Sequence, residues 1–369
     1  MTTSNSDTGT RQTVTRKRSR REREIARFLD EAGWGRATPE DLPGDASARS
    51  YRRLQQTGEG DPQTALLLME PAKRVRSSYA EAARLADGDV LAVAALGQQL
   101  VQRGFSAPRV LAGDVEAGLL LIEDFGDELY ARVLERDPDR EAELYGRAVD
   151  FLGALYRSTF TDRAGWQGRE WRIGSYSTDV LLTEVALLLD WYAPDQGWQV
   201  TDAARASWEV AWRDALEALD AHAPGLVLRD FHAENLFALD ARDFEATVGV
   251  IDYQDALFGH PAYDLASLLE DARRDVDPEL VPRLIERFCH RARVPDGPAF
   301  RAAYAVIGAQ RAAKILGIFV RLSERDGKPR YRTLLPRVEA HFHRALAHEA
   351  MTPVREWWEA HAVPAATPA

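Results

Sequence analysis

The clearest chemical feature of the chain is an aspartate and an asparagine five positions apart, Asp230 and Asn235. Both lie in residues 226–237, Leu-Val-Leu-Arg-Asp-Phe-His-Ala-Glu-Asn-Leu-Phe, where a short polar loop separates apolar segments. A second carboxylate, Asp252, follows the apolar run at residues 248–251. Phosphoryl transfer needs an aspartate to accept the proton of the attacking hydroxyl, and an asparagine and an aspartate to hold magnesium on the nucleotide phosphates. The spacing therefore indicates a kinase site, with Asp230 as base and Asn235 and Asp252 as metal ligands.

The residue types fit this chemistry because the protein in such a reaction mainly positions the nucleophile and neutralises charge. Magnesium prefers hard oxygen ligands and uses few protein carboxylates. An aspartate and an asparagine at this spacing are also common in turns, and that explanation would be equally good for the loop alone. The strand and Asp252 that follow favour the kinase interpretation, with ATP and Mg²⁺ as cofactors.

These two loops resemble the catalytic and metal loops of the aminoglycoside phosphotransferase and choline kinase superfamily. The segment at residues 260–266, His-Pro-Ala-Tyr-Asp-Leu-Ala, resembles the next motif of that family, whose aspartate, here Asp264, braces the catalytic loop. The resemblance covers roughly residues 23–350. It implies an α+β, protein-kinase-like two-lobed fold, with a small β-rich N-lobe and a larger helical C-lobe. It also implies that the backbone of a hinge at Glu123, Asp124 and Phe125 pairs with adenine.

Finer matches are similar to one subgroup, the bacterial kinases that phosphorylate the anomeric hydroxyl of N-acetylmuramate or N-acetylglucosamine in peptidoglycan recycling. These matches are residues 45–51, Asp-Ala-Ser-Ala-Arg-Ser-Tyr, residues 252–256, Asp-Tyr-Gln-Asp-Ala, and residues 310–319. The resemblance implies an ATP- and magnesium-dependent amino-sugar 1-kinase. Two alternatives remain: a kinase for another alcohol, such as an aminoglycoside, choline or homoserine, and a nucleotide-binding pseudokinase that regulates a partner. Leu228 and Met69 motivate the pseudokinase, because many members of the superfamily have a histidine and a lysine there.

The expected N-lobe contains paired strands at residues 51–54 and 65–69, joined by a turn, and a helix from about Asp89 to Arg103 with apolar residues at helical spacing. A buried strand at residues 118–122 leads into the hinge. We divide the chain into a disordered basic tail (1–22), a nucleotide-binding N-lobe (23–125), a C-lobe with the catalytic loop, metal site and acceptor pocket (126–352), and a flexible tail (353–369).

The position of Ser47, Ala48 and Arg49 corresponds to the loop that covers the phosphates in the family. Its small residues would let backbone N–H groups approach phosphate oxygens, although no glycine-rich motif is present. Without the resemblance the segment would read as a polar turn before a strand. The lysine missing at Met69 would otherwise stabilise transition-state charge, and nearby cations could compensate. These are Arg49, Arg52, Arg53 and Lys73.

Aromatic residues beside carboxylates in the segment 166–198 suit a sugar pocket, although they equally suit packing between helices. The predicted acceptor-side residues are Glu184, Asp190, Trp191, Tyr192, Gln310 and Arg311. The cation of Arg311, with Lys314 beside it, would favour an anionic group such as a lactyl carboxylate, and surface ion pairing is the alternative. For His232 we favour bracing of the loop over proton relay. Asp255 either approaches the metal or sugar or caps the next element.

The composition limits the remaining possibilities. The chain has 369 residues, 45% hydrophobic, with a net charge of −11, which argues against general nucleic-acid binding. Seven basic residues within positions 11–23 read as a solvated tail, with an anionic surface as the alternative partner. We find no apolar run near the ~18 residues of a membrane span and no apolar centre of a secretory signal, so we expect a cytoplasmic protein that binds ATP and a small amino sugar. A single cysteine, Cys289, excludes an intrachain disulfide.

Overall fold

The computed structural model describes residues 20–42, 49–57, 64–70 and 85–362. Its N-terminal part is a five-stranded antiparallel sheet in the order β1-β2-β3-β5-β4. The strands are β1 (Thr38–Asp41), β2 (Ser50–Gln55), β3 (Thr64–Met69), β4 (Val110–Asp114) and β5 (Leu119–Glu123). The predicted α+β class, with a β-rich lobe before a helical one, is confirmed.

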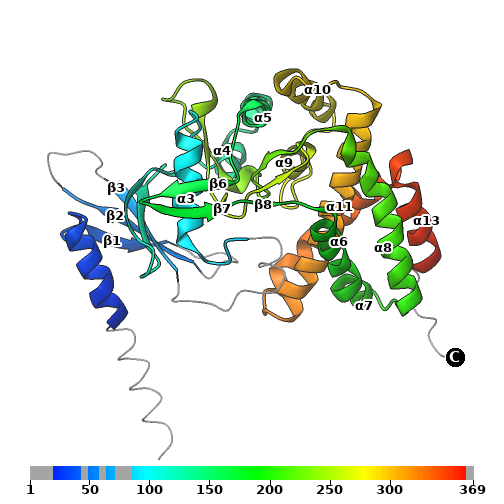
Figure 1. Cartoon of the computed structure of the whole chain (residues 1–369), viewed down its shortest axis with the longest axis horizontal. Coiled ribbons are helices and arrows are strands. Elements are labelled where there is room, and N and C mark those ends of the chain that lie inside the picture. The colour runs from blue at the N-terminus through cyan, green and yellow to red at the C-terminus, as the bar shows by residue number, and fades with distance from the viewer. Residues whose placement is uncertain (1–19, 43–48, 58–63, 71–84, 363–369) are drawn as a thin grey trace, which may run out of the picture.

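The two faces of this sheet bury different side chains because successive residues of a strand point to opposite sides. Ala65, Leu67 and Met69 of β3 pack in one cluster with the helix at residues 20–31, whereas Leu68 packs in another with α3 (Val90–Val101). Figure 1 shows α3, in cyan, between the sheet and the helical lobe. Asp89 caps α3 by accepting a hydrogen bond from the N–H of Leu91 (2.9 Å). The predicted helix and strands in this lobe are present within a few residues of the predicted limits.

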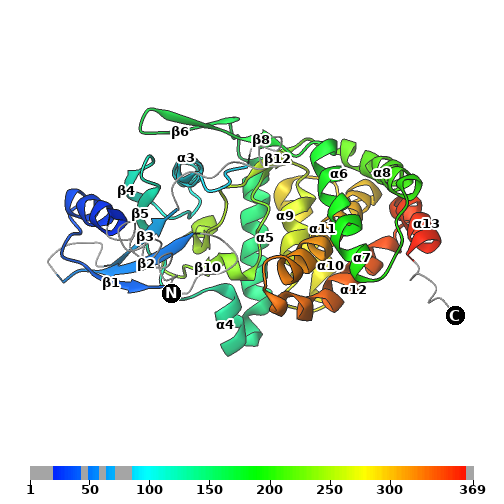
Figure 2. The same cartoon turned by 90° about the horizontal axis from the view of Figure 1, so that it is seen from below.

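The larger lobe is mostly helical. Its helices are α4 (Tyr130–Arg136), α5 (Glu141–Arg157), α6 (Thr178–Leu187), α7 (Ala193–Asp195), α8 (Asp202–Leu216), α9 (Ala262–Leu269), α10 (Leu280–Ala292), α11 (Pro298–Glu324), α12 (Leu335–Leu346) and α13 (Thr352–His361). A π-helical turn (Leu188–Tyr192) continues α6, and short 3₁₀ turns lie at Pro138–Arg140, Glu217–Ala221, Ala233–Asn235, Phe244–Thr247, Pro329–Leu334 and Glu349–Met351. The long helix α11 contacts α6, α9 and α12 at the centre of this lobe (Figure 2).

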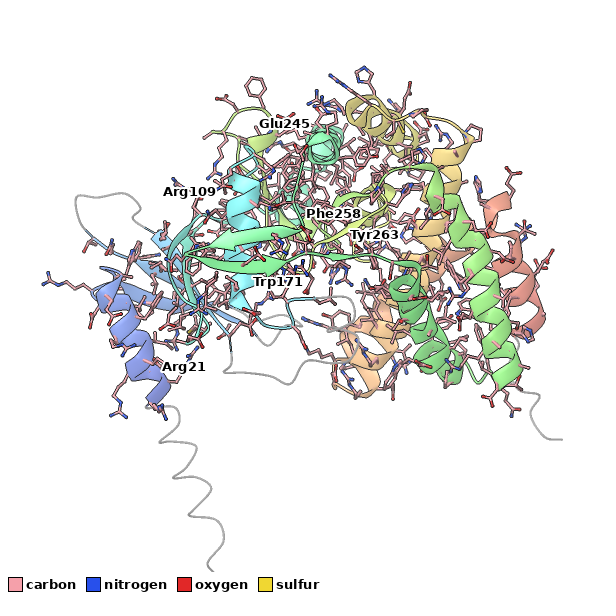
Figure 3. All side chains as sticks on the ribbon, viewed as in Figure 1. Arg21, Arg109, Trp171, Glu245, Phe258 and Tyr263 are labelled. Atoms are coloured by element: carbon pink, nitrogen blue, oxygen red, sulfur yellow. The ribbon has the colours of Figure 1, made fainter. Side chains whose placement is uncertain are left out.

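Seven short strands position the loops of the lobe. They are β6 (Arg163–Trp166), β7 (Arg169–Arg172), β8 (Gly174–Ser175), β9 (Gly225–Val227), β10 (Leu236–Ala238), β11 (Val248–Val250) and β12 (Leu257–Gly259). The hairpin β6–β7 reaches back to pack on α3, with Trp166 and Trp171 in the same core cluster as that helix. Figure 3 shows Trp171 on this hairpin, while Arg21 lies on the outer helix at residues 20–31. Strands β10 and β11 pair antiparallel, and β12 lies between β8 and β9.

Both predicted tails are too long. Residues 20–22 belong to the first helix, where the Arg21 guanidinium donates to the carbonyls of Ala117 (2.6 Å) and Glu70 (3.0 Å). Residues 353–361 belong to α13, whose Trp357 is buried. In the sequence Pro353 suggests the end of a helix, because proline breaks a helix interior. Proline is favourable in the first turn, however, and Pro353 lies in the first turn of α13. Residues 1–19 and 363–369 lie outside the described residues.

The sequence reading also missed an apolar helix. By length and composition α11 could cross a membrane, yet 78% of its most apolar stretch is buried inside the fold. Three polar side chains, Gln310, Arg311 and Lys314, interrupt it and made the apolar run look short. Because its buried residues pack against α6 and α9, this helix forms the core of the larger lobe.

Candidate active site

The catalytic loop, residues 228–235, connects β9 to β10 and is held at its start by Asp264 of α9. The carboxylate of Asp264 accepts hydrogen bonds from the N–H groups of Leu228 (2.7 Å) and Arg229 (2.8 Å). Burial raises the pKa of Asp264 to about 7, and these two hydrogen bonds oppose that shift. Arg229 has φ +74°, a left-handed conformation that turns the chain sharply before Asp230. The brace therefore fixes the backbone immediately before the proposed base.

The far end of the loop is held by Asn235. Its Nδ2 donates to the carbonyl of Asp230 (2.9 Å), and its backbone N–H donates to the carbonyl of His232 (2.8 Å). The side chain of His232 is buried, and its Nε2 lies 3.4 Å from the amide nitrogen of Asn235. Burial lowers the pKa of His232, which keeps the ring neutral. These contacts place His232 in the packing of the loop.

Pairing of β10 with β11 brings the metal-site candidates together. Leu236 lies opposite Val250, and the N–H of Ile251 donates to the carbonyl of Asn235 (3.1 Å), so Asp252 emerges beside Asn235. Asp252 has φ +61°, which turns its carboxylate out of the strand direction, and that side chain remains 43% exposed. Partial removal from water and the negative charge of Asp230 raise the pKa of Asp252.

The electrostatics of Asp230 are the opposite. Burial alone would raise its pKa, but the positive charges of Lys314 and Arg229 lower it. Asp230 is therefore ionised at neutral pH, as a proton acceptor must be. Together Asp230, Asn235 and Asp252 offer the hard oxygen atoms that suit Mg²⁺, and the amide oxygen of Asn235 points away from the bond that its nitrogen makes. A divalent cation would relieve the repulsion between the two carboxylates.

The predicted nucleotide-side residues form three groups, which are Ser47 with Ala48, then Arg49, and then the hinge residues Glu123, Asp124 and Phe125. Ser47 and Ala48 lie outside the described residues. Arg49 is buried, with its Nε 2.5 Å from Oε1 of Glu70 and its Nη1 3.2 Å from Oδ1 of Asp252.

The hinge side chains make contacts of their own. Glu123 accepts from Arg242 (2.6 Å), Asp124 pairs with Arg53 (2.8 Å), and Phe125 packs on Phe237. With these side chains engaged, the hinge backbone is the part suited to meet an adenine. Since Arg53 lies on β2 and Arg242 lies on the β10–β11 connection, the hinge is fastened to both lobes.

The predicted acceptor residues Glu184, Gln310 and Arg311 are instead buried behind the catalytic loop. Glu184 is 1% exposed and Gln310 is fully buried, so both side chains are enclosed by protein. Arg311 donates to the carbonyl of Arg229 (3.0 Å) and to the hydroxyl of Ser267 (2.7 Å). In the ligand-free protein these three side chains hold the loop in place, and their contact with an acceptor stays a prediction.

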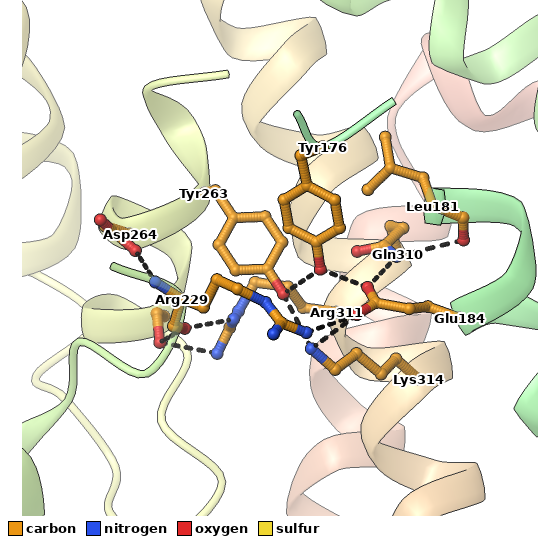
Figure 4. Close-up of polar contacts among 10 residues, drawn as sticks. Tyr176, Leu181, Glu184, Arg229, Tyr263, Asp264, Gln310, Arg311 and Lys314 are labelled. Carbon is orange, nitrogen blue, oxygen red and sulfur yellow. Dashed lines mark hydrogen bonds and ion pairs between the residues drawn. The ribbon is translucent and has the colours of Figure 1, made fainter. Parts of the chain in front are cut away.

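Glu184 is the centre of this network, which Figure 4 shows. It accepts from Arg229 (2.8 Å), Gln310 (2.9 Å) and the hydroxyl of Tyr176, and it pairs with Lys314 (3.1 Å). The hydroxyl of Tyr263 accepts from Lys314 (3.1 Å) and lies 2.7 Å from that of Tyr176. A buried carboxylate with two cationic partners is compensated, whereas loss of one partner would leave a buried charge.

The other acceptor predictions are not brought to this loop. Asp190 pairs with Arg205 of α8 (2.9 Å), and Tyr192 donates to Glu339 of α12 (2.8 Å). Trp191 is half-buried against the same cluster, which packs α8, α12 and α13 together. In the described part of the chain these contacts join helices of the larger lobe, and a role for these residues at the acceptor stays a prediction.

Two further residues connect the N-lobe to the loop that follows β11, residues 251–256, which we call the metal loop. Oδ1 of Asp255 accepts from the N–H of Ala86 (2.6 Å), and the hydroxyl of Tyr253 donates to the carbonyl of Val93 (3.3 Å). This contact differs from both roles considered for Asp255, because it joins that residue to the segment that leads into α3. The metal loop is thereby docked against α3.

Sequence reasoning missed Glu70, Arg229 and Tyr176. Strand alternation was the available signal for Glu70, because residues 66, 68 and 70 share a face opposite that of Met69. Arg229 and Tyr176 had no local signal, since their importance comes from a buried carboxylate supplied by a distant helix.

Comparison with known proteins assigns this site to a family. A model described as the phosphotransferase enzyme family matches residues 38–304. Two relatives carry the name N-acetylmuramate/N-acetylglucosamine kinase. The one from Caulobacter vibrioides is 38% identical, over 92% of this chain and 96% of the relative. The one from Pseudomonas aeruginosa is 31% identical, over 85% of this chain and 86% of the relative.

Solved structures agree on the fold. A choline/ethanolamine kinase family protein from Mesorhizobium loti aligns with a TM-score of 0.58 at 16% identity, over 91% of this chain and 99% of that chain. A gentamicin complex of APH(2″)-IIa aligns with a TM-score of 0.55 at 16% identity, over 89% and 97%. These matches confirm the expected aminoglycoside phosphotransferase and choline kinase fold. With a family match across residues 38–304 and a relative 38% identical over 92% of its length, the chain belongs to the phosphotransferase enzyme family.

Proposed function

We propose that this protein is an ATP- and Mg²⁺-dependent kinase that phosphorylates the anomeric hydroxyl of N-acetylmuramate or N-acetylglucosamine, in peptidoglycan recycling. The observation that carries the proposal is the convergence of Asp230, Asn235 and Asp252 at the end of the β10–β11 pair. The sugar rests on the relatives that carry this activity in their name and align over most of the chain.

In this mechanism Asp230 accepts the proton of the attacking hydroxyl. Lys314 and Arg229 lower the pKa of Asp230 and keep it ionised, while Asp264 and Asn235 fix the loop backbone on either side of it. An anomeric hydroxyl is more acidic than a simple alcohol, so the contribution of a general base, typically about 10²- to 10⁴-fold, is sufficient. Asn235 and Asp252 would hold Mg²⁺, which when bound neutralises charge on the transferring phosphoryl group.

On the acceptor side, Lys314 is the most exposed cation of the described network around Glu184. Lys314 has a 12% exposed side chain, against 2% for Glu184 in the same network. It is therefore the network residue best placed to face an anionic substituent, such as the lactyl carboxylate that N-acetylmuramate has and N-acetylglucosamine lacks.

The test is ATP consumption with Mg²⁺ against N-acetylmuramate, N-acetylglucosamine, glucosamine, choline, homoserine and kanamycin, with Asp252→Ala as the blank. We expect turnover on an N-acetylated sugar and none on its methyl glycoside, whose anomeric oxygen is blocked. Preferred turnover of choline, homoserine or kanamycin would replace the sugar with another alcohol. ATP binding without turnover of any acceptor would support a pseudokinase.

A further inference from the structure

Met69, where many family members have a lysine, lies on the outward face of β3. Met69 packs with Phe28 and Leu67 in the cluster beneath the helix at residues 20–31, on the side of the sheet away from α3. A lysine at that position would not face the cleft. The interpretation of Met69 as the position of a lost phosphate ligand is therefore wrong, because strand alternation turns it outward.

The next residue, Glu70, lies on the cleft side. In the register of β2 and β3, Ser50 is opposite Met69, so Arg49 and Glu70 are neighbours across the end of the two strands. Oε1 of Glu70 lies 2.5 Å from Nε of Arg49, and both side chains are buried. The helix α3, which covers this face, contains no acidic residue in its 12 positions. Among the described residues, the buried carboxylate that holds the cleft cation thus comes from the sheet.

The same guanidinium reaches the metal site. Its Nη1 lies 3.2 Å from Oδ1 of Asp252. Of the other candidate cations, Arg52 pairs with Glu22 (3.0 Å) and Asp41 (2.8 Å) on the outer face, and Arg53 pairs with Asp124 at the hinge (2.8 Å). Lys73 lies outside the described residues. Of the described candidates, Arg49 is the one whose ion pair reaches the metal loop.

The geometry gives Arg49 a fixed end and a working end. A guanidinium has five donors in a rigid plane, and its planar fork matches phosphate oxygens. The buried Glu70 fixes the Nε edge, and the Nη end points to Asp252. In the ligand-free protein Arg49 neutralises a carboxylate that would otherwise repel Asp230. A metal that takes over Asp252 frees this end of Arg49 for a phosphate.

We propose that Arg49, oriented by Glu70, is the phosphate-binding cation of this enzyme, and that it exchanges Asp252 for the nucleotide phosphates when a divalent metal binds. In this pair the residue after β3 supplies the carboxylate and the residue before β2 supplies the cation. This inference rests on the proposed function only in that a nucleotide is the phosphoryl donor.

The experiment compares Arg49→Gln with Arg52→Gln in the full-length protein. Arg52 is the matched control because it lies three residues further along, on β2, and faces outward. The affinities of Mg²⁺·ADP and of adenosine are measured by titration calorimetry. One lost charge-assisted contact predicts that Arg49→Gln weakens ADP binding by about ten- to a hundredfold. Adenosine affinity should stay unchanged, since adenosine has no phosphate, and Arg52→Gln should bind both ligands as the wild type does.

A second variant keeps the test decisive if the single change damages the fold by leaving Glu70 buried and unpaired. Arg49→Gln combined with Glu70→Gln removes both charges and retains hydrogen-bonding groups. We expect the same selective loss of ADP affinity in this double variant. Wild-type ADP affinity in either variant, or an equal loss of ADP and adenosine affinity in the double variant, would overturn the proposal.

The exchange at Asp252 has a separate measurement. With Mn²⁺ as the probe and no nucleotide present, Arg49→Gln should bind the ion more tightly than the wild type, because the competing cation is gone. Unchanged or weaker Mn²⁺ binding would overturn the exchange. None of these titrations contains a sugar, so an enzyme that is inactive on every amino sugar would refute the proposed function and leave this result standing.

Discussion

Asp230 and Asp252 carry the same functional group in opposite electrostatic surroundings. Lys314 and Arg229 lower the pKa of Asp230, whereas partial removal from water and the charge of Asp230 raise the pKa of Asp252. One carboxylate is stabilised as an anion by fixed protein charges. The other needs an added cation, which Arg49 supplies in the ligand-free protein. Their substitution should therefore affect different steps.

We expect Asp230→Asn to lower kcat by about 10²- to 10⁴-fold, the usual contribution of a general base, with Mg²⁺·ADP affinity close to that of the wild type. Asp252→Asn should abolish the dependence of ADP affinity on Mg²⁺, because it removes a charged metal ligand. Steady-state kinetics and calorimetric titrations with and without Mg²⁺ separate these effects. If Asp230→Asn reduced the Mg²⁺ dependence more than Asp252→Asn did, the two roles would have to be exchanged.

At the scale of single elements, α3 and the metal loop meet without room for a side chain. A Cβ placed on Gly97 of α3 would lie 2.3 Å from the hydroxyl of Tyr253 and 3.2 Å from its Cζ. Tyr253 directly follows Asp252, so a shift of this ring moves the metal site. Gly97→Ala should cost about 1–3 kcal/mol through overpacking. It should also lower kcat, because displacements near 1 Å can reduce rates by about 10²-fold.

The hydroxyl provides the control for this prediction. Tyr253→Phe removes the atom that the new methyl group would meet, together with one hydrogen bond to Val93. The double variant should therefore recover both the thermal unfolding midpoint and kcat relative to Gly97→Ala alone. Equal defects in the single and double variants would mean that the docking of α3 on the metal loop does not depend on this contact.

The last helix, α13, is a structural part of the larger lobe. Trp357 packs against Trp208 with ring centroids 4.5 Å apart and ring planes tilted by 58°, and its Nε1 donates to the carbonyl of Ala204 (2.8 Å). Trp357→Ala should destabilise the protein by about 3–5 kcal/mol, as removal of a buried aromatic ring usually does. Urea unfolding would measure it, with the exposed Glu359→Ala on the same helix as control. A loss below about 1 kcal/mol would show that α13 contributes little to the core.

The helix α6 shows where prediction from sequence stops. Glu184 and Tyr192 were both predicted on the acceptor side. The π-helical turn at Leu188–Tyr192 contains one more residue than an α-helical turn and therefore rotates the side chains that follow. The position of Tyr192 around the helix axis, relative to Glu184, therefore differs from that in an uninterrupted α-helix. Catalytic-loop residues were easier to predict, because Asp230 and Asn235 are held by contacts within the loop itself.

At the scale of the whole molecule, the family resemblance predicted the class and order of the lobes, and periodic patterns predicted elements of the first lobe. Apolar residues at helical spacing marked α3, and short apolar runs marked β3 and β5. The burial of Glu184 and Arg311 could not be predicted in this way. Charged residues are normally assigned to the surface, and their compensation here comes from α6, α11 and the catalytic loop together, which are far apart in the chain.

Stability against pH is a property of the whole molecule, and the buried His341 of α12 gives it a measurable component. Burial, with the charge of Arg344 beside it, lowers the pKa of His341 to about 4. In the unfolded chain a histidine titrates near pH 6.5, so the unfolded state binds the proton more tightly. The contribution of the neutral ring is complete above about pH 6.5 and is lost as the pH falls towards 4. At pH 5 the free energy of unfolding is therefore about 2 kcal/mol lower, through this residue, than above pH 6.5.

Other buried groups also make stability depend on pH, and in opposite directions. The contribution of His341 is therefore measured as the difference between the wild type and a variant without it. His260 has a pKa lowered to about 3 by burial and acts in the same direction, whereas Asp264 and Glu270, with pKa values raised to about 7 by burial, take up protons in the folded state and act in the opposite one. We therefore compare wild type with His341→Leu at pH 7.5 and pH 5 by thermal unfolding. The variant should gain relative to the wild type at pH 5. The exposed His343→Leu on the same helix should change stability equally at both pH values. If His341→Leu also changed it equally, the ring would be protonated in the folded protein at pH 5, and its burial would not oppose its charge.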